Sequence, residues 1–192
     1  MPATPPDFAS LSLAEIARLA EENRLPPVES WNPEHCGASD MRIARDGTWY
    51  HQGSPIGRVA MVRLFSTILR REPDGRFVLV TPVEKLDIEV EDAPFQALEM
   101  KREGEGAAMK LAFRLNTDEM VTAGPDRALR FADTPEGPRP YLHVRAGLEA
   151  LVARPVYYEL AQIALENGSD PAGVWSDGAF FALEPVHREP GA

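Results

Sequence analysis

The feature of this sequence that most limits its fold is a short internal repeat. Moving residues 55–69 by 96 positions places them on residues 151–165 with three identities. The identical pairs are Arg58 with Arg154, Leu64 with Leu160 and Leu69 with Leu165. Further along, DGRFVLVTP (74–82) meets DGAFFALEP (177–185), where Asp, Gly, Phe and Pro coincide. Repetition in a fixed order predicts two similar units, although Asp-Gly turns before apolar strands also match by chance.

Helical periodicity indicates three helices. Apolar residues follow a capping box in residues 12–23, which predicts an N-terminal helix. The second helix is predicted over residues 55–70, with Ser54 as its N-cap. The third covers residues 147–166, with a kink expected at Arg154-Pro155.

Short apolar runs bounded by turn residues indicate strands. Asp46-Gly47 between two alternating runs predicts a β-hairpin, and RFVLVTP predicts a buried strand. Between residues 84 and 124, apolar runs are separated by turn residues, which is the pattern of an antiparallel meander. Further strands are predicted in ALRF, PYLHV and GAFFALEP.

These elements predict an α+β fold with two similar units of β-hairpin, helix and strand, linked by an antiparallel β-meander and preceded by an N-terminal helix. The expected divisions are an N-terminal extension with its helix (1–30), a first repeat unit (31–95), and the meander with the second repeat unit (96–192). Two similar units leave a seam between them, and such seams are frequent ligand-binding sites.

The charge of the chain limits its partners. Its 30 acidic and 20 basic residues give a formal charge of −10 and a pI near 4.9. Nucleic acids and anionic membranes attract clustered Lys and Arg, so neither is an expected partner. We expect a small-molecule ligand or a protein partner instead, and a homo-oligomer.

Location and chemistry are limited mainly by what the sequence lacks. No apolar run approaches the ~18 residues of a membrane span, and the N-terminus lacks the pattern of a secretory signal. Cys36 is the single cysteine, which is typical of a cytoplasmic protein. Motifs for phosphate, dinucleotide, nucleophilic-serine and paired-histidine zinc sites are also missing. We therefore predict no catalytic residue, no metal and no cofactor.

The segment GSPIGR is a candidate anion site. Ser54 and Arg58 would lie at a helix N-terminus, where free N–H groups and positive potential attract anions. A cation there requires an anionic partner, either a bound phosphate or carboxylate, or an acid of the chain such as Glu84 or Asp92. Through the repeat, Arg154 is the matching candidate.

Two predicted strands carry further candidate ligand-binding residues. TPVEKLDIEVEDAPF is rich in acids and includes Glu84 and Lys85. Two of its carboxylates could act as acid and base, or all could form a solvated strand face. Tyr141, His143 and Arg145 alternate and so share one face of a predicted strand, which could bind a ligand or be a plain polar surface.

Several long stretches match one known bacterial family in order. They are WNPEHCG, DMRIARDGTWYHQGSPIGR, MVRLFSTILRREPDGRFVLVTPVEK, IEVEDAPF, PYLHVRAGLEALVARPVYYELA and GVWSDGAFFALEP. Over residues 31–185 the chain resembles domain-of-unknown-function family 1285. The resemblance implies a repeat-containing α+β protein without an assigned activity, for which a signalling or regulatory role is considered. It carries over no catalytic residue.

Three functional hypotheses are open. The first is a non-enzymatic ligand-binding or regulatory protein that binds a small anionic molecule at Arg58, or at the seam near His143 and Arg145. The second is a hydrolase or isomerase that uses carboxylates between Glu84 and Asp92. The third is an adaptor that docks a protein partner through a sheet edge or an apolar patch. The missing catalytic motifs favour the first.

Overall fold

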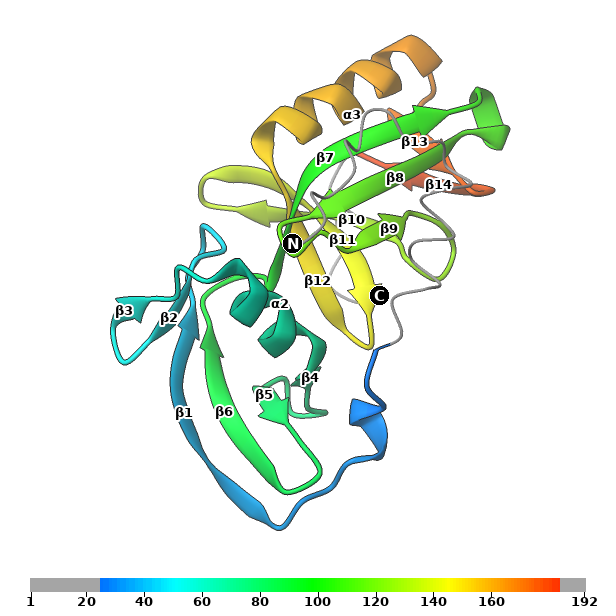
Figure 1. The fold of residues 1–192 in the computed structure, drawn as a ribbon. Helices are drawn as coiled ribbons and strands as arrows, with labels where there is room; N and C mark the ends of the chain where they lie inside the picture. The colour runs from blue at the N-terminus through cyan, green and yellow to red at the C-terminus, as the bar shows by residue number, and fades with distance from the viewer. Residues whose placement is uncertain (1–24, 184–192) are drawn as a thin grey trace, which may run out of the picture.

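The computed structural model describes residues 25–183, which form two units, each built on a six-stranded sheet (Figure 1). The first sheet has the strand order β3-β2-β1-β6-β5-β4. Helix α2 connects β3 to β4, and a short 3-10 helix, η2, precedes β1. The bounds are η2 (Val28–Ser30), β1 (His35–Ile43), β2 (Trp49–His51), β3 (Ser54–Pro55), α2 (Val59–Thr67), β4 (Leu69–Arg71), β5 (Phe77–Val80) and β6 (Glu84–Val90).

The second sheet has the strand order β10-β11-β12-β7-β8-β9. Helix α3 follows the sheet and packs against β7 and a small separate hairpin, β13-β14. The bounds are β7 (Phe95–Glu103), η3 (Gly106–Ala108), β8 (Lys110–Leu115), β9 (Met120–Thr122), β10 (Leu129–Thr134), β11 (Gly137–Arg145), β12 (Leu148–Val152), α3 (Arg154–Asn167), β13 (Gly173–Ser176) and β14 (Ala179–Ala182).

The two sheets share one topology. In each sheet the first and last strands in sequence, β1 with β6 and β7 with β12, pair in parallel at the centre. Every other neighbouring pair is antiparallel, so each sheet consists of two three-stranded meanders that meet at its parallel pair. The prediction of two similar units therefore holds at the level of the sheets.

The order of helix and strand within the units differs from the predicted repeat. Helix α2 lies in the middle of the first unit, whereas α3 follows the last strand of the second sheet. The alignment of Arg58 with Arg154 therefore joins helices at different places in the two units. Similar apolar spacing, followed in both cases by an Asp-Gly hairpin turn, produced the match.

The second predicted helix is shorter than expected and starts later. Ser54 and Pro55 form the edge strand β3, and α2 starts at Val59. An edge strand tolerates a proline because its missing N–H need not complete a ladder. The prediction of Ser54 as a helix N-cap is therefore wrong.

The third predicted helix also starts later than expected. Leu148–Val152 forms β12, and α3 begins at Arg154. Pro155 occupies the first turn of α3, where its N–H would have no partner within the helix. The proline thus marks the start of this helix and does not kink it. The helix predicted over 12–23 lies outside the described residues.

The hairpin and meander predictions are confirmed in part. Asp46-Gly47 turns β1 into β2, and Gly47 has a φ of +86°, which glycine adopts without steric cost. β7, β8 and β9 form an antiparallel meander. This meander belongs to the second sheet and does not merely link the two units.

One hydrophobic core runs through both units. Its largest fully buried side chains include Trp49 in the first unit and Phe95 and Phe113 in the second. Phe95 is the first residue of β7, so the core continues through the segment that joins the two sheets. Between residues 25 and 183, no helix is long and apolar enough to cross a membrane.

Candidate functional site

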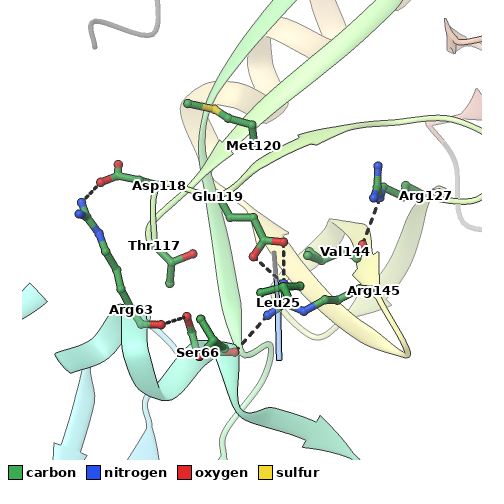
Figure 2. A pocket seen from close by; sticks show the side chains of 11 residues that line it. Leu25, Arg63, Ser66, Thr117, Asp118, Glu119, Met120, Arg127, Val144 and Arg145 are labelled. Atoms are coloured by element: carbon green, nitrogen blue, oxygen red, sulfur yellow. Dashed lines mark hydrogen bonds and ion pairs between the residues drawn. The ribbon is translucent and has the colours of Figure 1, made fainter. Parts of the chain in front are cut away.

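A pocket of about 380 Å³ lies at the seam between the two units (Figure 2). The first unit lines it with Arg63, Ser66 and Thr67 of α2, together with Leu25. The second unit contributes the turn 117–120 between β8 and β9, Arg127, and Val144 and Arg145 at the end of β11. Its volume is within the range of small-molecule sites.

The carboxyl end of α2 forms one wall of the pocket. Ser66 is buried, and its hydroxyl donates to the Arg63 carbonyl at 2.7 Å within the last turn. The Ser66 carbonyl accepts a hydrogen bond of 3.0 Å from Nη2 of Arg145. A cation near the C-terminus of a helix satisfies a carbonyl that lacks a helical partner.

The turn between β8 and β9 forms the opposite wall. The Glu119 carbonyl accepts from the Leu115 N–H at 2.9 Å, and Asp118 has a φ of +64°. This tight turn presents Thr117, Asp118 and Glu119 to the pocket. Asp118 forms an ion pair with Arg63 of α2, which links the two units across the seam.

Arg145 connects the two walls. Its Nη1 donates to both carboxylate oxygens of Glu119, at 2.6 and 2.5 Å, while its Nη2 binds Ser66. Its guanidinium carbon lies 5.2 Å from the centre of the Phe95 ring. Because a planar guanidinium donates in several directions, one arginine orders parts of both units.

The charge of the pocket is opposite to that of the chain. Three guanidinium groups (Arg63, Arg127, Arg145) face two carboxylates (Asp118, Glu119), which leaves a formal charge of +1. Within residues 25–183, Arg127 forms no ion pair; its Nε donates to the Val144 carbonyl at 3.3 Å. An anion can therefore bind Arg127 without first displacing a carboxylate.

Thr117 carries an unpaired hydroxyl at this site. The residue is 7% exposed, and its Oγ1 has no hydrogen-bond partner among the residues that the structure describes. Figure 2 shows its side chain turned toward the interior of the pocket and toward the Glu119 carboxylate. A buried hydroxyl left unpaired costs about 1–3 kcal/mol, so a partner from a ligand would be favourable.

Of the residues predicted from sequence, Arg145 lies in this pocket. Ser54 and Arg58 are exposed outside it, and Arg154 is exposed at the start of α3. Arg58 makes no ion pair within residues 25–183, and Asp92 binds Arg139 instead. Of the two alternatives for Arg58, an ion pair with an acid of the chain such as Glu84 or Asp92 is therefore not formed among the described residues.

The three side chains predicted to share one face of β11 (Tyr141, His143 and Arg145) make different contacts. Tyr141 is buried and donates to Asp92 at 2.8 Å; its burial, and then this bond, raise the pKa of the phenol to about 12. His143 Nδ1 lies 3.1 Å from the Asp126 carbonyl, and the Gly147 N–H donates to Nε2 at 3.1 Å. These partners fit a neutral imidazole protonated on Nδ1.

The acids between residues 84 and 92 lie outside the seam pocket. Lys85 Nζ is 3.7 Å from Glu72, and Asp87 pairs with Arg76. The backbone N–H of Arg45, followed by the guanidinium of Arg42, lowers the pKa of the Glu91 carboxyl. Asp87, Glu91 and Asp92 thus form ion pairs along the strand and just beyond its end.

Sequence reasoning missed most of the pocket. Arg63, Thr117, Glu119 and Arg127 belong to no common motif, and only the fold brings them together. The sequence signal that existed was the set of turn residues between the apolar runs of residues 84–124, and it did not indicate which side chains would face those turns. In the described part of the chain, no group of three or more His, Cys, Asp or Glu residues is placed to hold a metal ion.

The fold and the pocket define a two-unit α+β protein with a charged pocket at its seam. The N-terminal domain model of the family of unknown function DUF1285 matches residues 26–93, and its C-terminal domain model matches residues 94–183. The chain belongs to the DUF1285 family.

Two solved structures are similar to this chain. A DUF1285 family protein from Silicibacter pomeroyi DSS-3 is 46% identical, with a TM-score of 0.79 over 89% of this chain and 95% of the other. A DUF1285 family protein from Shewanella baltica OS155 is 23% identical, with a TM-score of 0.49 over 64% of this chain and 91% of the other. The search of curated proteins found no match.

Proposed function

We propose that this protein is a non-enzymatic binding protein for a small organic anion, which it holds in the seam pocket. The observation that carries the proposal is Arg127, a guanidinium without an acid partner within residues 25–183, in a pocket of charge +1 on a chain of charge −10. Opposite charge in a partly enclosed site favours an anion more strongly than it would at an open surface.

The pocket also has an apolar component that fits the carbon chain of such a ligand. Leu25, Met120 and Val144 line it beside the charged groups. Small-molecule sites commonly combine apolar walls with a few polar groups that set orientation. The favoured ligand is therefore an aliphatic carboxylate rather than a bare inorganic anion.

Calorimetric titration with hexanoate tests this function. We expect hexanoate to bind, and we expect Arg127→Met to weaken binding at least tenfold, whereas hexan-1-ol and hexylammonium should bind at least tenfold more weakly than hexanoate. Arg58→Met is the matched control, because Arg58 is an exposed arginine outside the pocket. Equal binding of hexan-1-ol and hexanoate, or full affinity in Arg127→Met, contradicts the proposal.

A regulatory role is the second part of the proposal. The pocket is crossed by two links between the units, the Arg63–Asp118 ion pair and the bond from Arg145 to Ser66. An anion that competes for either guanidinium would change these links, and binding would shift the balance between arrangements of the units. The homo-oligomer and the cytoplasmic location stay predictions.

Trp49 offers a direct test of this coupling. It is fully buried in the first unit, and its ring stacks on Phe65 of α2 with centroids 6.4 Å apart. If hexanoate moves α2, the Trp49 emission changes with the same dissociation constant as calorimetry gives. Replacing Trp31 and Trp175 by Phe isolates this signal. An unchanged emission at saturating hexanoate contradicts the regulatory part and leaves the binding proposal standing.

A further inference from the structure

We infer that the seam pocket selects hydroxycarboxylates, with Thr117 and Glu119 as the residues that recognise the ligand hydroxyl. This inference rests on the proposed anion-binding function and adds the class of ligand. It starts from the Thr117 hydroxyl, which is buried in the wall of the pocket and has no hydrogen-bond partner within residues 25–183.

The position of this hydroxyl points to a ligand and not to structural support. Ser66, a buried hydroxyl in the opposite wall, donates to the Arg63 carbonyl at 2.7 Å. Thr117 instead turns its side chain toward the pocket (Figure 2). Burying a hydroxyl without a partner is unfavourable, and a ligand oxygen in the pocket would remove that cost.

Glu119 decides which ligand oxygen fits best. Its carboxylate lines the same space and accepts two bonds from Arg145, which leaves further lone pairs available. A ligand hydroxyl between the two residues can accept from Thr117 and donate to Glu119. A ligand carbonyl can accept from Thr117 but would place its oxygen against a carboxylate, which is repulsive.

Arg127 fixes the other end of the ligand. Figure 2 shows Arg127 and Thr117 on different sides of the pocket, with Leu25 between them in this view. A carboxylate at Arg127 therefore leaves the carbon chain to reach toward Thr117. The ligand hydroxyl that Thr117 and Glu119 recognise is then distant from the ligand carboxylate and lies further along the aliphatic chain.

Titration of the full chain with three six-carbon acids tests this selectivity. We expect 5-hydroxyhexanoate to bind at least tenfold tighter than hexanoate, and 5-oxohexanoate to bind no tighter than hexanoate. In Thr117→Val, which keeps the shape and removes the hydroxyl, 5-hydroxyhexanoate should fall to the affinity of hexanoate. The affinity of hexanoate itself should be unchanged.

The ligand-free Thr117→Val variant supplies an independent readout. Because it removes an unpaired buried hydroxyl, its melting temperature should equal or exceed that of the parent protein. A clear drop in melting temperature shows that the hydroxyl has a structural partner and overturns the inference.

The two proposals fail in different ways. If hexanoate binds but 5-hydroxyhexanoate gains nothing, or if Thr117→Val weakens both acids equally, the hydroxyl selectivity is wrong and the anion site stands. If neither acid binds the parent protein, the anion site is wrong and the selectivity falls with it.

Discussion

Tyr141 donates its phenolic hydrogen to Asp92, 2.8 Å away, and so ties β11 of the second unit to the segment that joins the two sheets. Asp92 also forms an ion pair with Arg139, so its carboxylate has one partner on each oxygen. The arrangement fixes the connection between the units from the side of the second sheet. Its strength depends on the phenol keeping its proton.

Tyr141→Phe is expected to lower the free energy of unfolding by about 2 kcal/mol at neutral pH, because a bond to a charged acceptor is lost. In the parent protein the folded-state pKa of Tyr141 is about 12, above the ordinary value of about 10. The stabilisation is therefore complete below pH ~10 and is lost as the pH rises toward ~12. Urea unfolding from pH 7 to 12 should show the two proteins converging.

Tyr158→Phe is the control for this prediction, since Tyr158 is 61% exposed. Absorbance titration near 295 nm should show a late ionisation in the parent protein and in Tyr158→Phe that is missing in Tyr141→Phe. A constant stability gap between parent and Tyr141→Phe across this range contradicts the raised pKa.

Arg70 anchors the start of the described chain to the first sheet. It is 6% exposed, and its Nη1 donates to the carbonyls of Val28 and Trp31 at 2.7 Å each, while Nε binds Glu72 at 2.7 Å. Arg70→Met should cost about 3 kcal/mol in urea unfolding, because a partly buried carboxylate loses its arginine partner and two backbone carbonyls lose their donor.

The free energy of unfolding of Arg70→Lys should lie between those of the parent protein and Arg70→Met, since a lysine keeps the charge but not the several N–H donors of the guanidinium. Arg76→Met is the matched surface control: Arg76 pairs with Asp74 and Asp87 at the exposed end of the same sheet. Exposed ion pairs contribute little to stability, so the free energy of unfolding of this variant should be close to that of the parent protein. If Arg70→Met and Arg76→Met lose the same free energy of unfolding, the claim that Arg70 anchors the start of the described chain is contradicted.

Ser176 joins the small hairpin to the second sheet. It is fully buried, its Oγ donates to the Ala123 carbonyl at 2.7 Å, and it accepts from the Leu111 N–H at 2.9 Å. Ser176→Ala leaves both backbone groups unpaired away from water, so we expect a loss of about 2–3 kcal/mol in thermal or urea unfolding.

Ser39 provides a matched control, because its hydroxyl has the same two roles at a more open position. It donates to the Asp87 carbonyl at 2.7 Å and accepts from the Met41 N–H at 3.1 Å. Water can replace the hydroxyl there, so Ser39→Ala should cost less than half as much as Ser176→Ala. The reverse order would show that burial does not set the cost.

Glu119→Gln changes the charge of the seam pocket from +1 to +2 and frees one face of Arg145. We expect hexanoate to bind about fivefold tighter or more, roughly 1 kcal/mol, with a steeper dependence on salt. Isothermal titration at two salt concentrations measures both effects. Weaker binding in Glu119→Gln would show that Arg145 needs its carboxylate partner to hold the anion.

Local patterns predicted most strands and the turn at Asp46-Gly47, because alternation and turn chemistry act within a few residues. They misplaced the starts of α2 and α3. Ser54, predicted to cap a helix, lies in the edge strand β3. Pro155, predicted to kink a helix, lies in the first turn of α3. In both cases pairing with neighbouring strands outweighed the local preference.

The seam pocket was predictable only as a location. Two similar units imply a seam, and the sequence indicates Arg145 as one residue near it. Its partners Glu119 and Ser66, however, lie 26 and 79 residues away in sequence. Spacing rules do not reach across such distances. The pairing of β1 with β6 and β7 with β12 in parallel is equally long-range and decides which side chains meet.

The shared sheet topology has a consequence for synthesis of the chain. In each sheet the strand made last inserts between two strands made earlier: β6 between β1 and β5, and β12 between β7 and β11. Until the ribosome has released that strand, the two meanders of a unit have no ladder joining them. Each sheet can therefore close only in a late step, at Val90 for the first and Val152 for the second.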